Sequence, residues 1–126
     1  MEANKIIITG AATRMGAAIA KKLSGPGVEI VIHYNSSKSN AERLKKELNR
    51  NNTNVYLVKG DLSKEDDLKK ITKFAKSKLK YFDCLINNAS LFENDNLKNF
   101  TSKSWDKHLN VNLKAPAYLS KEFAKN

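Results

Sequence analysis

Short apolar segments alternate with longer amphipathic segments along this chain, and the alternation repeats four times. Apolar, β-branched stretches at 6–8, 28–34, 55–58 and 83–87 predict four strands. Each of them is followed by apolar positions at helical spacing, which predict helices beginning near 16, 39, 63 and 102. The last helix continues to the end of the chain. The pattern is therefore β-α-β-α-β-α-β-α.

This alternation predicts an α/β fold. Every crossover is long enough for a right-handed βαβ unit, so the strands form a parallel sheet with helices on both faces. We expect a Rossmann-type sheet with strand order 3-2-1-4, in a single dinucleotide-binding domain over residues 1–126. In such a sheet ligands bind at the carboxyl ends of the strands, where the loops at 9–16, 33–38, 60–62 and 87–92 should meet.

The helix ends and the last helix carry more detailed expectations. Ser39 to Glu42 has the form of a capping box, and Ser63 is placed to cap the third helix. Pro116 should kink the last helix or disturb its hydrogen bonds. An apolar stripe containing Trp105, Leu109 and Leu119 should pack that helix against the core.

Charge and cysteine content narrow the function classes. The net charge is +10, from 23 Lys and Arg against 13 Asp and Glu, and lysines spread over helical faces supply most of it. No Arg-rich tail, zinc motif or aromatic repeat accompanies them, so solvated faces that attract an anionic ligand are favoured over nucleic-acid binding. The single Cys84 excludes an internal disulfide and a thiolate metal site, and no metal is expected. Without a signal peptide or membrane span, we expect a cytoplasmic protein.

The first strand runs into a glycine turn, Thr9-Gly10-Ala11-Ala12-Thr13-Arg14-Met15-Gly16, and then into a helix. This geometry points backbone N–H groups and the positive helix end at a phosphate. Gly10 would permit the turn, and Gly16 would let the helix pack closely against the strand or a ligand. The spacing differs from G-x-G-x-x-G, so an ordinary βα turn is the alternative.

The loop after the second strand bears on the choice of cofactor. Between His33 and Lys38 there is no Asp or Glu to bind the ribose of NAD. Ser36, Ser37 and Lys38, together with Arg14, offer hydroxyl groups and positive charge to the extra phosphate of NADP. The alternative is a solvated loop that leads to a helix, and His33 alone is more often structural.

The ends of the third and fourth strands hold further polar or aromatic candidates. Asp61 could bind an adenine edge or satisfy backbone donors near a helix start. Asn87, Asn88 and Ser90 could orient a ligand, although Asn clusters also simply make turns. Phe92 is either a core residue of its loop or an aromatic wall for a flat substrate.

The ordered set TGAATRMG, HYNSS, DL, NNAS and VNL resembles the short-chain dehydrogenase/reductase family over essentially the whole chain. Within that family, TGAATRMG, HYNSS and NNASLF look like the pteridine reductases. The resemblance implies an NADP(H)-dependent oxidoreductase that reduces a pterin or dihydrofolate-type ring by hydride transfer. It also implies a small-molecule substrate and a homo-oligomer, a tetramer, for full-length members.

The resemblance assigns roles by position. It places Asn112 in the catalytic set, where it helps to hold a proton-relay water, and it places Arg14, Ser90 and Phe92 at the substrate. The cofactor-binding positions that it implies run along the strand ends: Gly10, Arg14, Met15, Gly16, His33, Tyr34, Ser36, Ser37, Asp61, Leu62, Asn88, Ala89 and Ser90.

Two departures from the family pattern stand out. Ser36 occupies a position where the pteridine reductases tend to carry Arg. The chain also ends before the later strands, which carry the family's catalytic Ser and Tyr-x-x-x-Lys, so we expect a truncated amino-terminal half without turnover of its own. Two alternatives remain open: a short-chain reductase of another carbonyl substrate, and a non-catalytic Rossmann module that binds a nucleotide or nucleic acid.

Overall fold

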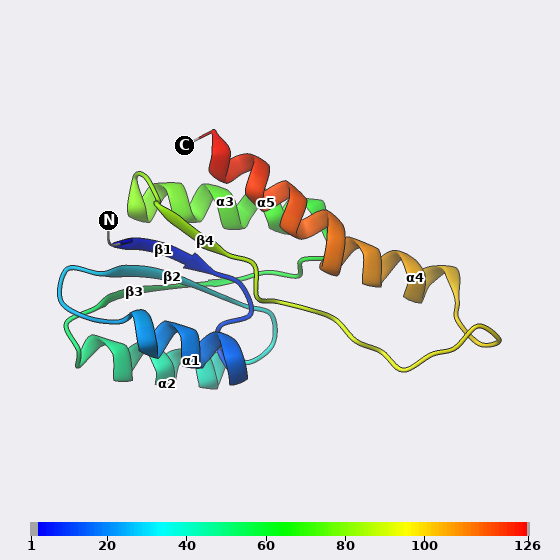
Figure 1. Cartoon of the computed structure of the whole chain (residues 1–126), viewed down its shortest axis with the longest axis horizontal. Helices are drawn as coiled ribbons and strands as arrows, with labels where there is room; N and C mark the ends of the chain where they lie inside the picture. Colours follow the sequence, from blue (N-terminus) through cyan, green and yellow to red (C-terminus); the bar gives the residue numbers. More distant parts are fainter. Residues whose placement is uncertain (1–2, 126) are drawn as a thin grey trace.

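The structure is a computed structural model that describes residues 3–125. Strands and helices follow the expected order (Figure 1). The strands are β1 (Lys5–Ile8), β2 (Glu29–Tyr34), β3 (Asn54–Lys59) and β4 (Cys84–Ile86). The helices are α1 (Arg14–Leu23), α2 (Lys38–Asn49), α3 (Glu65–Leu79), α4 (Ser102–Leu109) and α5 (Ala115–Ala124), with a π-helical segment, η1 (Asn110–Lys114), between the last two.

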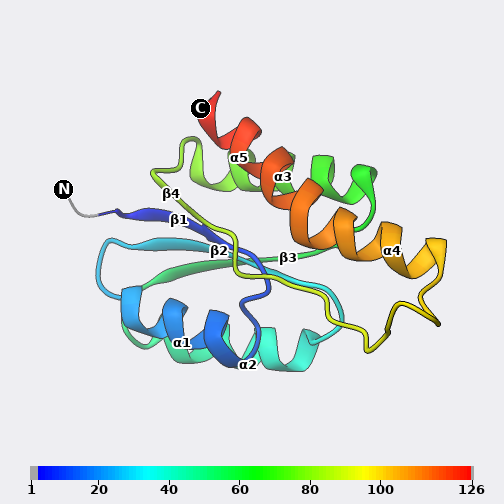
Figure 2. The same ribbon diagram turned by 45° about the vertical axis from the view of Figure 1, so that its right-hand side comes forward.

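The four strands form one parallel sheet in the order β3-β2-β1-β4, which confirms the predicted topology. Helices α1 and α2 cover one face, and α3 and α5 cover the other (Figures 1 and 2). The chain order changes direction between β1 and β4, so the loops after these two strands separate and leave a crevice at the carboxyl edge of the sheet.

Each face of the sheet carries its own hydrophobic core. Successive side chains of a strand point to opposite faces. Ile6 and Ile8 therefore lie in the core beneath α1 and α2, whereas Ile7 lies in the core beneath α3 and α5. Buried helix residues complete the two cores: Ala20, Leu44 and Leu48 on the first face, and Leu68, Ile71 and Leu119 on the second.

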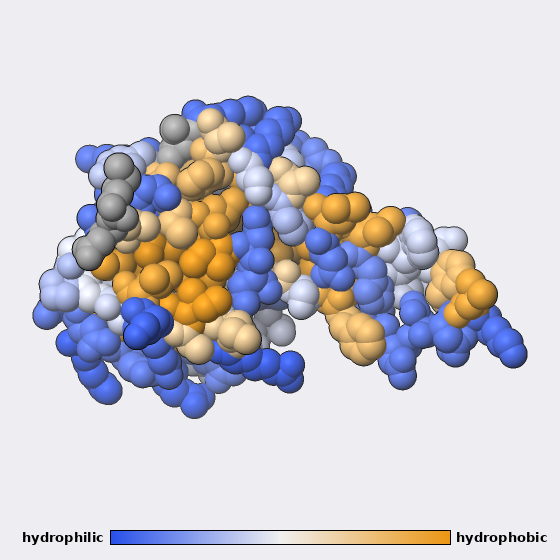
Figure 3. Space-filling view, in the orientation of Figure 1, coloured by the Kyte–Doolittle hydropathy of each residue, from blue (hydrophilic) through white to orange (hydrophobic). Residues whose placement is uncertain are grey.

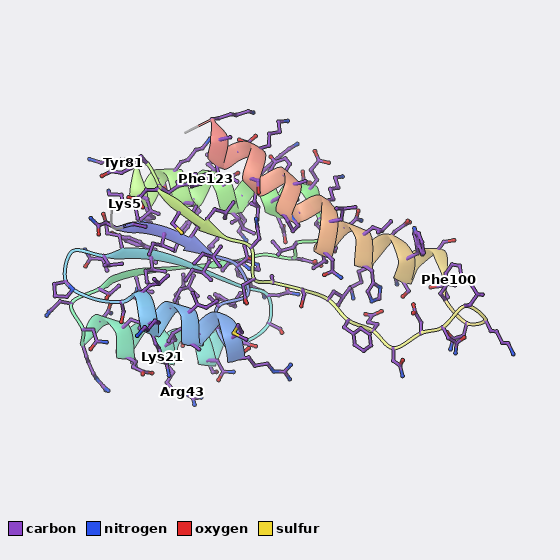
Figure 4. All side chains as sticks on the ribbon, viewed as in Figure 1. Lys5, Lys21, Arg43, Tyr81, Phe100 and Phe123 are labelled. Carbon is purple, nitrogen blue, oxygen red and sulfur yellow. The ribbon has the colours of Figure 1, made fainter. Side chains whose placement is uncertain are left out.

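The amino-terminal end of the β1–β4 pair is covered by polar side chains, whereas the outer edge of β4 is open in the described part of the chain. A polar cluster closes the amino-terminal end, where the Lys5 ammonium lies 4.5 Å from the ring centre of Tyr81 and 2.9 Å from the Glu29 carboxylate (Figure 4). Along its length, β4 pairs with β1 alone among the described residues. Cys84 and its strand neighbours are only half-buried, and Figure 3 shows apolar surface on this side of the molecule. Burial raises the pKa of the Cys84 thiol, consistent with an inert residue.

Two predicted helix caps are wrong. Helix α2 begins at Lys38 with Ser37 as its N-cap, so the Ser39–Glu42 pattern lies inside the helix. Helix α3 begins at Glu65, and the Ser63 side chain bonds instead to the Asp61 carboxylate two residues earlier. The predicted cap of α2, at Ser39, lies two residues too late, and the predicted cap of α3, at Ser63, lies one residue too early.

The last helix departs most from the sequence prediction. Its buried positions are Val111, Ala115 and Leu119, spaced by four, whereas Trp105 and Leu109 of the predicted stripe are exposed. The π-helical segment directly precedes Pro116 and adds a residue to the turn, which shifts the apolar face. Residues 91–101 and α4 extend away from the sheet, and we call residues 91–109 the arm (Figures 1 and 2).

Candidate functional site

A groove of about 620 Å³ opens at the carboxyl edge of the sheet. Residues that follow all four strands line it, joined by two residues from the last helical region. The lining consists of Gly10, Thr13, Arg14, Met15, His33, Asn35, Ser37, Asp61, Leu62, Asn88, Ala89, Ser90, Leu91, Lys107 and Val111. The predicted convergence of the strand-end loops is therefore what the structure shows.

The turn after β1 is held from beneath. Gly10 has a φ of 61°, which favours glycine, and a side chain there would meet the Ala89 backbone. Gly16 does not line the groove; a Cβ on it would lie 2.5 Å from the Gly10 carbonyl oxygen and 2.6 Å from the Asn88 amide nitrogen. Gly16 therefore lets α1 pack directly against the turn, one of the two roles expected for it.

His33 lies under this turn and is 2% exposed. The Gly10 N–H donates to its Nδ1 across 3.1 Å, and its Nε2 lies 2.7 Å from the Gly60 carbonyl oxygen. An amide can only donate and a carbonyl can only accept, so the neutral ring carries its proton on Nε2. Burial lowers the pKa of His33 and outweighs the opposite effects of the Gly60 bond and of the Asp61 and Asp67 carboxylates.

Asn88 and Thr9 fasten the end of β4 to the end of β1. The Asn88 side-chain amide donates to the carbonyl oxygens of Thr9 and Gly10, both at 3.1 Å. The backbone N–H groups of Asn88 and Ala89 donate to the Thr9 hydroxyl oxygen at 3.1 and 3.0 Å. These bonds fix the backbone course of Ala89 and Ser90 along the groove.

Arg14 is the cation at the mouth of the groove. It is the first residue of α1, it is exposed, and its φ of 50° is rare for a residue with a side chain. Its guanidinium makes no hydrogen bond or ion pair with the described residues. Strained backbone at a groove is typical of functional sites, and an unpaired guanidinium there is free to bind an anion.

A smaller cavity of about 100 Å³ adjoins the groove at the end of β2. The turn after β1 and the loop after β2 line it, through Gly10, Ala12, Thr13, Tyr34, Asn35, Ser36 and Ser37. Tyr34 and Ser36, which do not line the larger groove, thus lie beside it. The lining offers hydroxyl and amide groups and no carboxylate, which suits a phosphate better than a ribose diol.

Asp61 makes local hydrogen bonds near a helix start, one of the two roles considered for it, and its role at an adenine edge stays a prediction. Its carboxylate accepts hydrogen bonds from the Ser63 amide at 2.9 Å and the Ser63 hydroxyl at 2.7 Å, and it also lines the groove. Burial raises the pKa of Asp61, but the two Ser63 bonds and the charges of Lys64 and Lys107 outweigh it, so the net shift is downward. The group therefore presents an ionised acceptor to the groove.

Asn112 lies in the π-helical segment, and its side chain bonds twice to one residue. Its amide oxygen accepts from the Leu91 N–H at 2.7 Å, and its amide nitrogen donates to the Leu91 carbonyl at 2.8 Å. This pair of bonds fixes the loop just beyond Ser90. The predicted role of Asn112 in holding a water stays a prediction.

Phe92 lies outside the groove, as do the predicted site residues Gly16 and Asn112, while Tyr34 and Ser36 line only the smaller cavity. The Phe92 side chain is 84% exposed and absent from the groove lining. Conversely, sequence reasoning missed Lys107 and Val111, which line the groove from the last helical region. Their spacing of four places both on one helical face, a signal that the incorrectly phased apolar stripe concealed.

Other site types find no support in the described part of the chain. Residues 3–125 contain no group of three or more His, Cys, Asp or Glu side chains that could hold a metal ion. Over the same residues, no helix is both long and apolar enough to cross a membrane.

Solved structures share this fold. A short-chain dehydrogenase from Burkholderia cenocepacia J2315 in complex with NADP superimposes with a TM-score of 0.92 at 25% identity, over 98% of this chain and 50% of that one. The alternative dihydrofolate reductase 1 FolM from Brucella canis, complexed with NADP, gives a TM-score of 0.86 at 32% identity, over 95% of this chain and 48% of that one.

Sequence comparison agrees with the structural comparison. A curated relative, the 3-oxoacyl-[acyl-carrier-protein] reductase FabG from Staphylococcus epidermidis, is 28% identical over 108 residues, which are 86% of this chain and 44% of that protein. The chain thus spans about half the length of the proteins that it matches. The short chain dehydrogenase family matches residues 4–126, nearly the whole sequence. On this match, and on the fold and groove described above, the chain belongs to the short-chain dehydrogenase family.

Proposed function

We propose that this chain is the cofactor-binding half of an NADP(H)-dependent short-chain reductase. Two observations together carry the proposal. Arg14, which lines the groove, has no partner for its guanidinium among the described residues, and the small adjoining cavity at the end of β2 is lined by no carboxylate. An acidic side chain at that place would bind a ribose diol and repel a phosphate. The NADP complexes of the Burkholderia and Brucella proteins support the same choice.

Residues from all four strand ends would hold such a cofactor. The amides of the turn after β1, with Gly10 and Arg14, would hold the pyrophosphate at the start of α1. Tyr34, Ser36 and Ser37 would surround the adenosine phosphate. The remaining contacts would come from Met15, from His33 beneath the turn, from Asp61 and Leu62 at the adenine, and from Asn88, Ala89 and Ser90 at the nicotinamide ribose.

The cofactor, when bound, supplies a hydride to the substrate, and the protein supplies orientation and electrostatics. Asn88 and Thr9 fix the backbone on which Ser90 presents its hydroxyl to the groove. Asn112 holds the next segment through Leu91 and would help to position a proton-relay water. The residues that line the groove include no tyrosine.

For the substrate we propose a pterin or dihydrofolate-type ring, which Arg14 and Ser90 would contact. The support is the sequence resemblance together with the 32% identity to the Brucella dihydrofolate reductase. A second candidate is another carbonyl compound, such as the 3-oxoacyl group named for the Staphylococcus relative. The position of Phe92, outside the groove, favours this second candidate, because no aromatic wall for a flat ring is in place.

We further propose that a full-length relative acts in the cytoplasm as a homo-oligomer, a tetramer. The first point to test is a separate proposal, that this chain alone does not turn over substrate. A steady-state assay of NADPH oxidation by this chain, with dihydrobiopterin and separately with an acetoacetyl thioester, tests the first point. No oxidation above background is expected, and turnover with either compound contradicts it. The compound that is turned over would then identify the substrate class.

The cofactor proposal is tested by calorimetric titration with NADP⁺ and NAD⁺. We expect clearly tighter binding of NADP⁺. Arg14→Ala should weaken NADP⁺ binding by roughly tenfold or more, because a charge-assisted bond to phosphate is lost. Arg50→Ala is the matched control, since Arg50 is the C-cap of α2 and does not line the groove. Equal affinity for the two nucleotides, or equal effects of the two substitutions, would overturn the proposal.

A further inference from the structure

His33 ties together the ends of three neighbouring strands. It stands in β2, it accepts the Gly10 N–H of the turn after β1, and it donates to the Gly60 carbonyl directly after β3. The Ala11 N–H also donates to the His33 carbonyl oxygen at 3.0 Å. His33 thus holds the turn after β1 at two places: its ring accepts from Gly10, and its carbonyl oxygen accepts from Ala11.

The two ring bonds require a neutral imidazole. A protonated ring carries N–H groups at both nitrogens, so Nδ1 would then face the Gly10 N–H with no lone pair to accept it. The Gly10 amide would lose its partner in a buried place, and a buried donor without an acceptor is costly. Relief would come from movement of the turn, because β2 is the central strand beneath it and is buried.

The charged groups around the ring come from two neighbouring elements. Asp61, just after β3, and Asp67, on α3, favour protonation of His33, while Lys70 on α3 opposes it. Burial is the stronger influence, and the His33 pKa lies below its ordinary value. The Gly10 turn is therefore in its described form at neutral pH and becomes strained as the pH falls.

We propose that His33 is a positioning residue that holds the Gly10 turn in its cofactor-binding form only while its ring is neutral, so that acidification weakens cofactor binding. The expected effect of pH on cofactor binding rests on the proposed NADP(H) function, whereas the expected effect on the Gly10 turn does not. The sign follows from linkage: the unfolded chain takes up this proton near pH 6.5, and the folded chain takes it up at lower pH. The stability that neutral His33 contributes is complete above about pH 6.5 and is lost as the pH falls toward its folded pKa.

The cofactor-independent test is nuclear magnetic resonance of the whole chain. At pH 7.5 the ring nitrogens of His33 should show the Nε2–H tautomer, and the Gly10 amide should be protected from hydrogen exchange. Gly10 protection should fall as His33 takes up its proton. A Gly10 amide that stays protected through the His33 titration overturns the proposal, and so does a ring that stays neutral down to acid unfolding.

The cofactor-dependent test compares affinities for NADP⁺ at pH 7.5 and pH 5.5 in the wild type and in His33→Gln. A glutamine amide can accept from Gly10 and donate to Gly60 without titrating. The phosphate of the probe itself titrates near pH 6, and this affects both proteins equally. The loss of affinity over this range should be larger in the wild type than in the variant, by a factor below about ten, because the His33 pKa lies below its ordinary value of 6.5.

His108→Gln is the matched control. The other histidine of the chain makes the same kind of bond, accepting the Glu93 N–H at Nε2 across 3.0 Å, but it lies on the arm and outside the groove. This variant should keep the wild-type pH dependence. Equal pH dependence of wild type and His33→Gln would overturn the proposal, whereas absence of NADP⁺ binding at every pH would overturn the proposed function and leave the resonance test to decide the role of His33.

Discussion

The turn after β1 and the arm flank the same groove, yet they are held in different ways. Buried side chains fasten the turn: Thr9 and His33 are almost inaccessible and bond to backbone groups across the strand ends. Exposed bonds fasten the arm, through Asn112 to Leu91, His108 to Glu93, and Lys107 to Glu93 at 3.1 Å. Surface pairs of this kind contribute little, so the turn is preorganised and the arm is the first part to open.

The exposure of apolar side chains also differs between the turn and the arm. Ala11 and Ala12 of the turn are buried, although Met15 at the start of α1 is exposed. On the arm, Phe92, Leu97, Phe100, Trp105 and Leu109 are all exposed. Phe100 lies far out on the arm, with its ring centre 5.8 Å from that of Trp105 (Figure 4). The turn after β1 is thus held by buried groups, whereas the apolar side chains of the arm, including Phe92, are exposed among the described residues.

The largest expected effect breaks the turn. Gly16→Ala would place a Cβ 2.5 Å from the Gly10 carbonyl oxygen, and backbone atoms cannot move aside cheaply. We expect a loss of about 3–5 kcal/mol in the free energy of unfolding, measured by urea denaturation. Gly25→Ala is the control, because nothing lies within 4 Å of a Cβ there. Similar losses in both variants would show that the close approach at Gly16 is not what matters.

A second comparison removes one leucine from each region. Leu48 is fully buried beneath the sheet, and Leu97 is 89% exposed on the arm. Leu48→Ala should cost about 2–4 kcal/mol of unfolding free energy, since it leaves a cavity. Leu97→Ala should change it by less than about 0.5 kcal/mol. An equal cost for both would mean that the arm is packed in solution and that the contrast between the regions is wrong.

A smaller and local effect is expected at Asn112. Asn112→Ala removes both side-chain bonds to Leu91 and leaves that N–H dependent on water. We expect faster hydrogen exchange along residues 91–95, corresponding to a local loss of about 1–2 kcal/mol, with the amides of β1 and β2 unchanged. Mass spectrometry of exchanged peptides measures both regions at once. Faster exchange in β1 would show that the arm and the turn are coupled.

The smallest effect on stability should come from making the arm polar. The double substitution Phe92→Ser and Leu97→Ser removes two exposed apolar side chains and leaves both hydrophobic cores unchanged. The free energy of unfolding in urea should change by less than about 0.5 kcal/mol. Self-association measured by sedimentation should fall, because exposed apolar patches promote association. Unchanged association would assign it to another surface, such as the open edge of β4.

The sequence by itself determined the sheet and most of the groove. Apolar runs separated by helical periods predicted the parallel sheet and its order, since strands buried on both faces leave few other arrangements. The loops from Gly10, His33, Asp61 and Asn88 could be placed at one edge because the carboxyl ends of parallel strands coincide.

Tertiary structure alone decided the details that depend on distant partners. The orientation of His33 between Gly10 and Gly60 links residues 23 and 27 positions apart, which no local pattern contains. Helix α4 extends away from the sheet and buries no residue, so Trp105 and Leu109 stay exposed, and the π-helical segment before α5 alters the helical period. Sequence periodicity assumes a constant turn, so it misplaced Trp105 and Leu109 and overlooked Lys107 and Val111 at the groove.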